Sequence, residues 1–172
     1  MKLVTEHDVK PEEIESATVH AGTNILKPIR YPIAKNHLQA KFSLPAELAM
    51  IALARRAGKV EFSDDFVASD AMQDMQRRIR TELDPDIEKM GFDKVRSRIV
   101  IKRKDGLTVE GSADERYRGG PDNPMSDAEL EAKVRSCCAG VLSDSQQDHL
   151  IAAAWGVATA KDATALVDHL TP

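Results

Sequence analysis

The segment from residue 95 to residue 113 constrains the fold more than any other part of the sequence, because it reads as a β-hairpin. Val95, Ile99 and Ile101 fall on one face of an extended segment, with the charged residues Arg96 and Arg98 among those between them, as in a strand with one buried face. Asp105-Gly106 follows as the turn, and we expect a positive φ at both positions. The return strand repeats the alternation, so the hairpin predicts a sheet with one packed face and one wet face.

An alanine-rich helical run lies between Gln39 and Gly58. Pro45 is tolerated only in a first turn, so the helix should begin near Ser43, with the serine hydroxyl as its N-cap. Gly58, after two arginines, is typical of a helix C-terminus. The run therefore predicts one tightly packed helix with defined ends.

Further helices and strands surround these two segments. Residues 23–36 read as a loop, and Ser126 with Glu129 forms a capping box at the start of a late helix. Other expected elements are a strand around Thr18-Val19, a helix after Ser69, a short strand at 79–83, and helices at 145–159 and 163–170. This order predicts an α+β fold with two layers, in which helices pack on one side of an antiparallel sheet. We expect residues 1–172 to form a single domain.

Charge and hydropathy exclude several classes of partner. The chain has 24 Lys and Arg residues against 28 Asp and Glu residues, a net charge of −4, which argues against general affinity for nucleic acid or anionic membranes. The apolar stretches at Leu44–Leu53 and Leu150–Val157 are too short or too interrupted to span a bilayer. Residues 1–8 lack an apolar signal segment. We therefore expect a cytoplasmic protein.

The residue types favour neither a metal nor a bound cofactor. Cys137 and Cys138 are adjacent and carry no ligand spacing around them, so we interpret them as small, partly buried thiols. The five histidines include no HExxH pair. Gly119-Gly120 lacks the pattern of a phosphate loop and reads as a turn. We expect no metal and no cofactor.

Three residues are candidates for binding a substrate. His37 lies in a segment that leads to the alanine-rich helix, where it could transfer protons or simply be solvated. Lys41 and Ser43 stand at the start of that helix, where a lysine charge and free amides could hold a carboxylate. A capping serine and a solvated lysine explain the same residues, and the residue types alone favour that reading.

Several segments together resemble the C-terminal domain of the MmgE/PrpD family. The most specific are AKFSLP, within residues 36–50, and RGGPDNPMSDAELEAK, within residues 118–134. VRSRIVIKRKDG at 95–106 and the stretches that begin at Glu6 and at Phe62 are also similar. The family includes 2-methylcitrate dehydratase, cis-aconitate decarboxylase and iminodisuccinate epimerase, which are lyases and isomerases of small di- and tricarboxylates.

The resemblance implies a site shared between two domains. Family members carry a large helical domain before this one, and a catalytic Lys and His would precede Met1. Several members have Tyr where this chain has Ala46, so a hydroxyl is missing here. Lys41, Ser43 and His37 remain as substrate-binding candidates. The chemistry implied is metal-independent proton transfer next to a carboxylate.

We therefore expect part of a dehydratase, decarboxylase or epimerase that lacks the helical catalytic domain and is inactive alone. Its partners would be a small polycarboxylate, if a helical domain completes the site, and either a second copy or a separate partner chain. One alternative is a non-catalytic dimerisation or partner-binding domain with a degenerate site. Another is an unrelated small α+β binding module.

Overall fold

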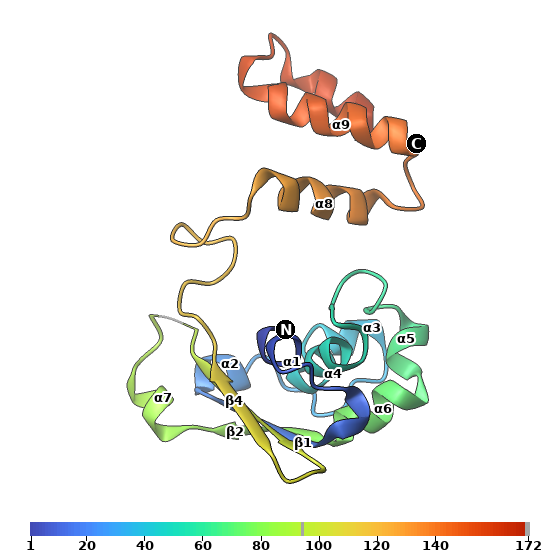
Figure 1. The fold of residues 1–172 in the computed structure, drawn as a ribbon. Helices are drawn as coiled ribbons and strands as arrows, with labels where there is room; N and C mark the ends of the chain where they lie inside the picture. The colour runs from blue at the N-terminus through green and yellow to red at the C-terminus, as the bar shows by residue number, and fades with distance from the viewer. Residues whose placement is uncertain (94, 171–172) are drawn as a thin grey trace. The chain divides into compact units, whose positions relative to one another are not determined.

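The computed structural model describes residues 1–93 and 95–170, and within it the chain divides into two compact units (Figure 1). Unit 1 spans Met1–Glu115 and unit 2 spans Arg116–Pro172. Each unit is described by itself below. The assignment of residues 1–172 to one domain stays a prediction.

Unit 1 is built on a four-stranded sheet with the order β2-β1-β3-β4. The strands are β1 (Ile14–Ala21), β2 (Ile79–Leu83), β3 (Ser97–Arg103) and β4 (Thr108–Ser112). β1 pairs antiparallel with β3, and β3 with β4, but β1 and β2 are parallel. The α+β class is confirmed, whereas an entirely antiparallel sheet is wrong. The helices between β1 and β2 bring the chain back to the end of the sheet at which β1 begins. β2 therefore runs in the same direction as β1.

The β3–β4 hairpin is present where the alternation predicted it. Its turn is wider than two residues, since the Arg103 N–H donates to the Leu107 carbonyl at 2.8 Å and the Gly106 N–H donates to the Arg103 carbonyl at 3.0 Å. Gly106 has φ +87°, but Asp105 does not have a positive φ. The Asp105 carboxylate instead accepts from the Leu107 N–H at 3.0 Å. The left-handed conformation in this turn is therefore needed at the glycine alone.

Short helices make up most of the rest of unit 1. They are α1 (Lys2–Glu6), η1 (Pro11–Glu13), α2 (Thr23–Leu26), α3 (His37–Ala40), α4 (Leu44–Ala54), α5 (Asp64–Ala68), α6 (Asp70–Arg77) and α7 (Pro85–Lys89). The predicted loop at 23–36 thus begins with the single turn of α2. α4 begins after Ser43, as predicted. It ends at Ala54 rather than near Gly58, because Arg55 takes the left-handed position.

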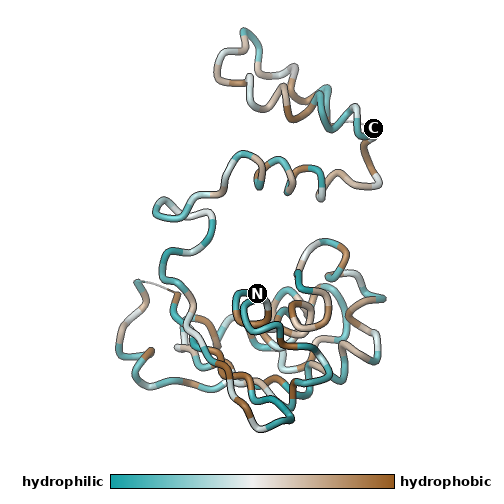
Figure 2. Tube along the Cα trace, viewed as in Figure 1, coloured by the Kyte–Doolittle hydropathy of each residue, from teal (hydrophilic) through white to brown (hydrophobic). Residues whose placement is uncertain are grey.

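The core lies between one face of the sheet and α4 with α6. Ala17, Val19 and Ala21 of β1 are buried, in step with the pleat of the strand. Ala46, Ala49, Met50 and Ala52 of α4, and Met72 and Met75 of α6, are buried as well. Hydrophobic positions recur along the strands and along these helices (brown in Figure 2). Alanine, valine and methionine side chains thus form much of this core, in a chain with few aromatic residues.

The other face of the sheet carries polar and charged residues. Lys102 forms an ion pair with Glu15 at 2.7 Å, and the guanidinium of Arg80 lies 3.1 Å from the Glu82 carboxylate. These pairs are largely exposed, so each adds little stability. Their effect is to keep much of this face in water.

Unit 2 contains α8 (Asp127–Cys138), α9 (Asp144–Gly156) and the 3-10 segments η2 (Val157–Thr159) and η3 (Ala163–Leu170). The predicted capping box is confirmed: the Ser126 N–H donates to the Glu129 carboxylate at 2.9 Å, and the Glu129 N–H donates to the Ser126 hydroxyl at 3.4 Å. α8 has no buried residue. Leu130 of α8 is 39% exposed. The contacts between α8 and α9 include a polar one, in which the Arg135 guanidinium donates to the Asp148 carboxylate at 2.7 Å.

No helix within residues 1–93 and 95–170 has both the length and the apolar character that crossing a membrane requires. This finding agrees with the sequence analysis of the two apolar stretches.

Arg55 joins the end of α4 to the N-terminal segment. Its φ is 57°, a conformation that costs a residue with a side chain about 1–2 kcal/mol. Its guanidinium donates to the backbone carbonyls of Val4 and Val9, the latter at 2.7 Å, and lies 3.6 Å from the Asp8 carboxylate. Charged donors make the stronger protein hydrogen bonds, so these contacts outweigh the backbone strain.

We expect Arg55→Gly to destabilise unit 1 by about 1 kcal/mol or more, although glycine suits the left-handed position better. A urea titration followed by the amide signals of β1 measures the change in the free energy of unfolding. Arg55→Asn, which also tolerates a positive φ, should lower the free energy of unfolding by a similar amount. An increase in stability with either variant would show that strain dominates.

Candidate functional site

His37 and Lys41 lie at the two ends of α3, one helical turn apart. Asn36 starts this helix, with its side-chain oxygen accepting from the Gln39 N–H at 2.9 Å. The Lys41 N–H donates to the His37 carbonyl at 3.3 Å and closes the turn. Both side chains are exposed. Residues four apart on a helical turn share a face, so the structure brings these two candidates together.

Asp64, the first residue of α5, holds His37. Its Oδ1 accepts from the His37 backbone N–H at 2.6 Å and lies 2.8 Å from the ring Nδ1. The His37 and Asp64 side chains are 50% and 62% exposed, so the pair is open to a ligand and to solvent.

The two hydrogen bonds from His37 lower the pKa of Asp64, with the backbone N–H as the larger cause and the ring as the second. An ionised Asp64 is purely an acceptor, so Nδ1 of the ring carries the proton that it donates. This leaves Nε2 as the ring nitrogen that Asp64 does not hold. A carboxylate that orients an imidazole in this way is a common element of general acid–base sites.

Ser43 takes no part in this exposed pair. Its side chain is fully buried, and its hydroxyl oxygen accepts from the Ala46 N–H at 3.1 Å. Ala46 is fully buried as well and presents no polar side-chain group. In this chain Ser43 acts as the N-cap of α4, and a contact between its hydroxyl and a ligand stays a prediction.

Apolar side chains flank the two charged candidates. Leu38 is 59% exposed and Phe42 is 47% exposed. We call the set His37, Leu38, Lys41, Phe42 and Asp64 the α3 corner. Leu38 and Phe42 therefore add exposed apolar surface next to His37 and Lys41.

Sequence reasoning missed Asp64 as a member of this corner. The Ser63-Asp64 pair does indicate the start of a helix, and Ser63 indeed accepts from the Phe66 N–H at 3.3 Å. The pairing with His37 joins residues 27 positions apart. A local pattern therefore contains no signal for it.

Among residues 1–93 and 95–170, no group of three or more His, Cys, Asp or Glu side chains is placed to hold a metal ion. The α3 corner itself offers one imidazole and one carboxylate. Beside that pair it carries the exposed ammonium group of Lys41.

We expect Ser43→Ala to lower the stability of unit 1 by about 1 kcal/mol, because the amides at the start of α4 lose their acceptor. Ser112→Ala, which removes an exposed hydroxyl from β4, is the matched control and should change little. Urea unfolding measures both. Equal effects from the two variants would contradict a capping role for Ser43.

The carboxyl of Asp64 should titrate below its ordinary value of 3.8, and its stabilising contribution should vanish as the pH falls through that lowered pKa. Above pH 3.8 the contribution is fully present, because the folded pKa is the lower one. Carbon NMR of the Asp64 carboxyl measures the midpoint. His37→Ala should raise it only in part, since the backbone N–H remains. An unshifted wild-type midpoint would refute the pairing.

Comparison with known proteins assigns the chain to a family. The family model of the MmgE/PrpD C-terminal domain matches residues 1–157. No curated protein sequence matches the chain significantly. The matched region includes all of unit 1, with the α3 corner, and most of unit 2. The chain therefore belongs to the MmgE/PrpD family, as a member of its C-terminal domain.

Proposed function

We propose that the chain supplies one half of a metal-independent site at which a small di- or tricarboxylate undergoes dehydration, decarboxylation or epimerisation. The other half would be a helical domain, carried by another part of the protein or by a partner chain. The observation that carries this proposal is the His37–Asp64 pair beside Lys41, within a chain of the MmgE/PrpD family.

Lys41 is assigned to one carboxylate arm of the substrate. Its ammonium group is exposed at the C-terminal end of α3, and it stands one turn from the imidazole. A lysine in this position attracts an anion as a point charge and sets no rigid geometry. Di- and tricarboxylates have a second arm for the covering domain to bind.

His37 is assigned to proton transfer. With Nδ1 held by Asp64, Nε2 can take a proton from the carbon next to a substrate carboxylate or return one. The Asp64 charge stabilises the imidazolium that results. The proton acceptor or donor on the opposite side of the substrate would come from the covering domain, because Ala46 provides no hydroxyl.

Leu38 and Phe42 support the need for a second surface. In the described structure they face solvent, although large apolar side chains are stabilised by burial. A covering domain would bury both and would exclude water from the reacting groups. The same chain would then show no turnover by itself.

The same two residues favour one alternative function, a non-catalytic domain that binds a partner chain or a second copy. Ser43 and Ala46 are buried, so neither presents a polar group at the surface. In that case the α3 corner would bind another protein surface, and His37 and Lys41 would only determine which surface it recognises.

The test combines the purified chain with the helical domain of a family member. Turnover is followed through the alkene absorbance of an unsaturated acid such as cis-aconitate. We expect activity only in the mixture. Lys41→Gln should lower kcat/KM by roughly tenfold to a hundredfold, mainly through KM. His37→Gln should lower kcat by roughly a hundredfold or more.

Lys104→Gln, which removes the same charge from the hairpin turn, is the matched control and should keep full activity. Full activity of the His37 and Lys41 variants would contradict the assigned roles. Binding of the helical domain without turnover, abolished by Leu38→Asp, would establish the partner-binding alternative instead.

A further inference from the structure

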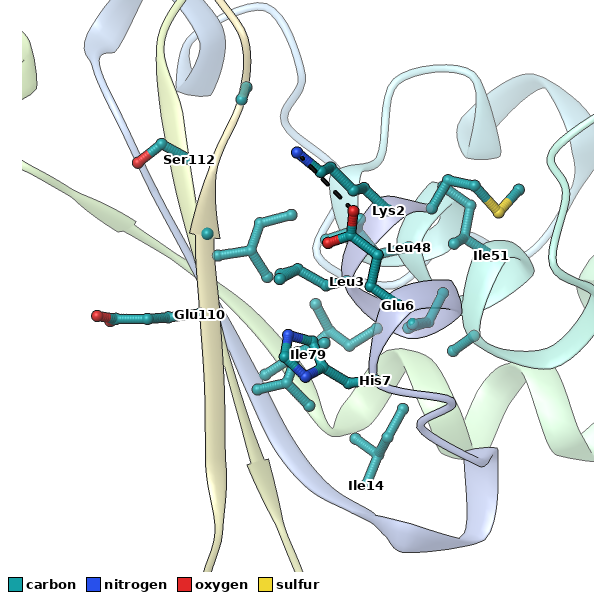
Figure 3. Close-up of a pocket in the computed structure, with 18 residues that line it drawn as sticks. Lys2, Leu3, Glu6, His7, Ile14, Leu48, Ile51, Ile79, Glu110 and Ser112 are labelled. Carbon is teal, nitrogen blue, oxygen red and sulfur yellow. Dashed lines mark ion pairs between the residues drawn. The ribbon is translucent and has the colours of Figure 1, made fainter.

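A partly open cavity of about 390 Å³ lies in unit 1 between α1, α4 and the sheet (Figure 3). Neither His37 nor Lys41 lines it, so it is separate from the α3 corner. We call it the α1 cavity. Its apolar wall is made by Leu3 and Val4 of α1, Leu48, Ile51 and Ala52 of α4, and Ile14, Ala17, Ile79, Ile99 and Ile101 of the sheet.

Small residues on facing elements create this space. Ala17 of β1 and Ala52 of α4 are both buried, at 6% and 4% exposed, and both line the cavity. The cavity is partly open to solvent, and its largely apolar lining favours an apolar molecule over water. The volume falls within the range of small-molecule sites.

Polar residues also contribute to the lining of the cavity. Figure 3 shows Lys2, Glu6 and His7 of the N-terminal segment at the cavity, whereas Glu110 and Ser112 of β4 project away from it. The Lys2 and Glu6 side chains form an ion pair at 3.9 Å and are 84% and 55% exposed. Such an exposed pair is weak, so Lys2 can turn to an anion at little cost.

We propose that the α1 cavity binds a medium-length aliphatic monocarboxylic acid, with the hydrocarbon chain against the apolar wall and the carboxylate near Lys2. The apolar wall selects the hydrocarbon, because burial of methylene groups supplies the affinity. A polycarboxylate would leave charged groups against Ile79 and Ile101 without partners, which excludes it from this cavity. The proposed site is therefore chemically distinct from the α3 corner.

Decanoate is the probe, titrated into the full chain and followed by methyl NMR of the isoleucines. The methyl groups of Ile14, Ile79, Ile99 and Ile101 should shift in a saturable manner. Ile25 and Ile151, which are buried outside the cavity wall, serve as internal controls and should not shift. This measurement uses the wild-type protein alone. Unchanged methyl signals of the cavity wall, or equal shifts at the two control residues, would overturn the proposal.

Ala52→Leu tests the same site by filling it. We expect at least a tenfold loss of decanoate affinity in calorimetry, whereas Ala132→Leu on the exposed surface of α8 should bind as the wild type does. Lys2→Gln should weaken decanoate severalfold and leave decanol unaffected. Unaltered affinity in a folded Ala52→Leu variant would contradict the assigned place, and equal losses for decanoate and decanol would contradict the role of Lys2.

Discussion

Burial of a single face of the sheet is the constraint on which the rest of unit 1 depends. Ala17 and Val19 of the inner strand β1 share one core cluster with the alanines of α4. Because α4 lies on that face, its first residue and its capping serine have a fixed place. The turn before it then brings His37 and Lys41 to the surface. The same contact between small residues leaves the α1 cavity open beside it.

Local signals predicted the elements whose cause is local. The β3–β4 hairpin, the capped start of α4 at Ser43 and the capping box at Ser126 each depend on a few neighbouring residues, and all three are confirmed. The parallel pairing of β1 with β2 was missed, because direction depends on the path of the intervening helices. Gly58 has the residue type of a helix end, but Arg55 takes that position through bonds to residues far away in the sequence.

The candidate site, too, combines residues that local sequence indicates with residues that only the fold brings together. His37, Lys41 and Ser43 were found through a resemblance and through their place before a helix, and their roles toward a ligand stay predictions. Asp64 was missed because its contact spans two helices. The exposure of Leu38 and Phe42 could not be predicted either, since a helical pattern does not tell a face that packs within the chain from one that meets another domain.

Gly111 of β4 has a consequence for the shape of unit 1. A Cβ atom at this position would lie 3.0 Å from the end of the Leu3 side chain, which is tighter than an ordinary van der Waals contact. An alanine at residue 111 would therefore make the Leu3 side chain shift by a few tenths of an ångström. Because Leu3 also lines the α1 cavity, that one added methyl group would reshape the cavity wall.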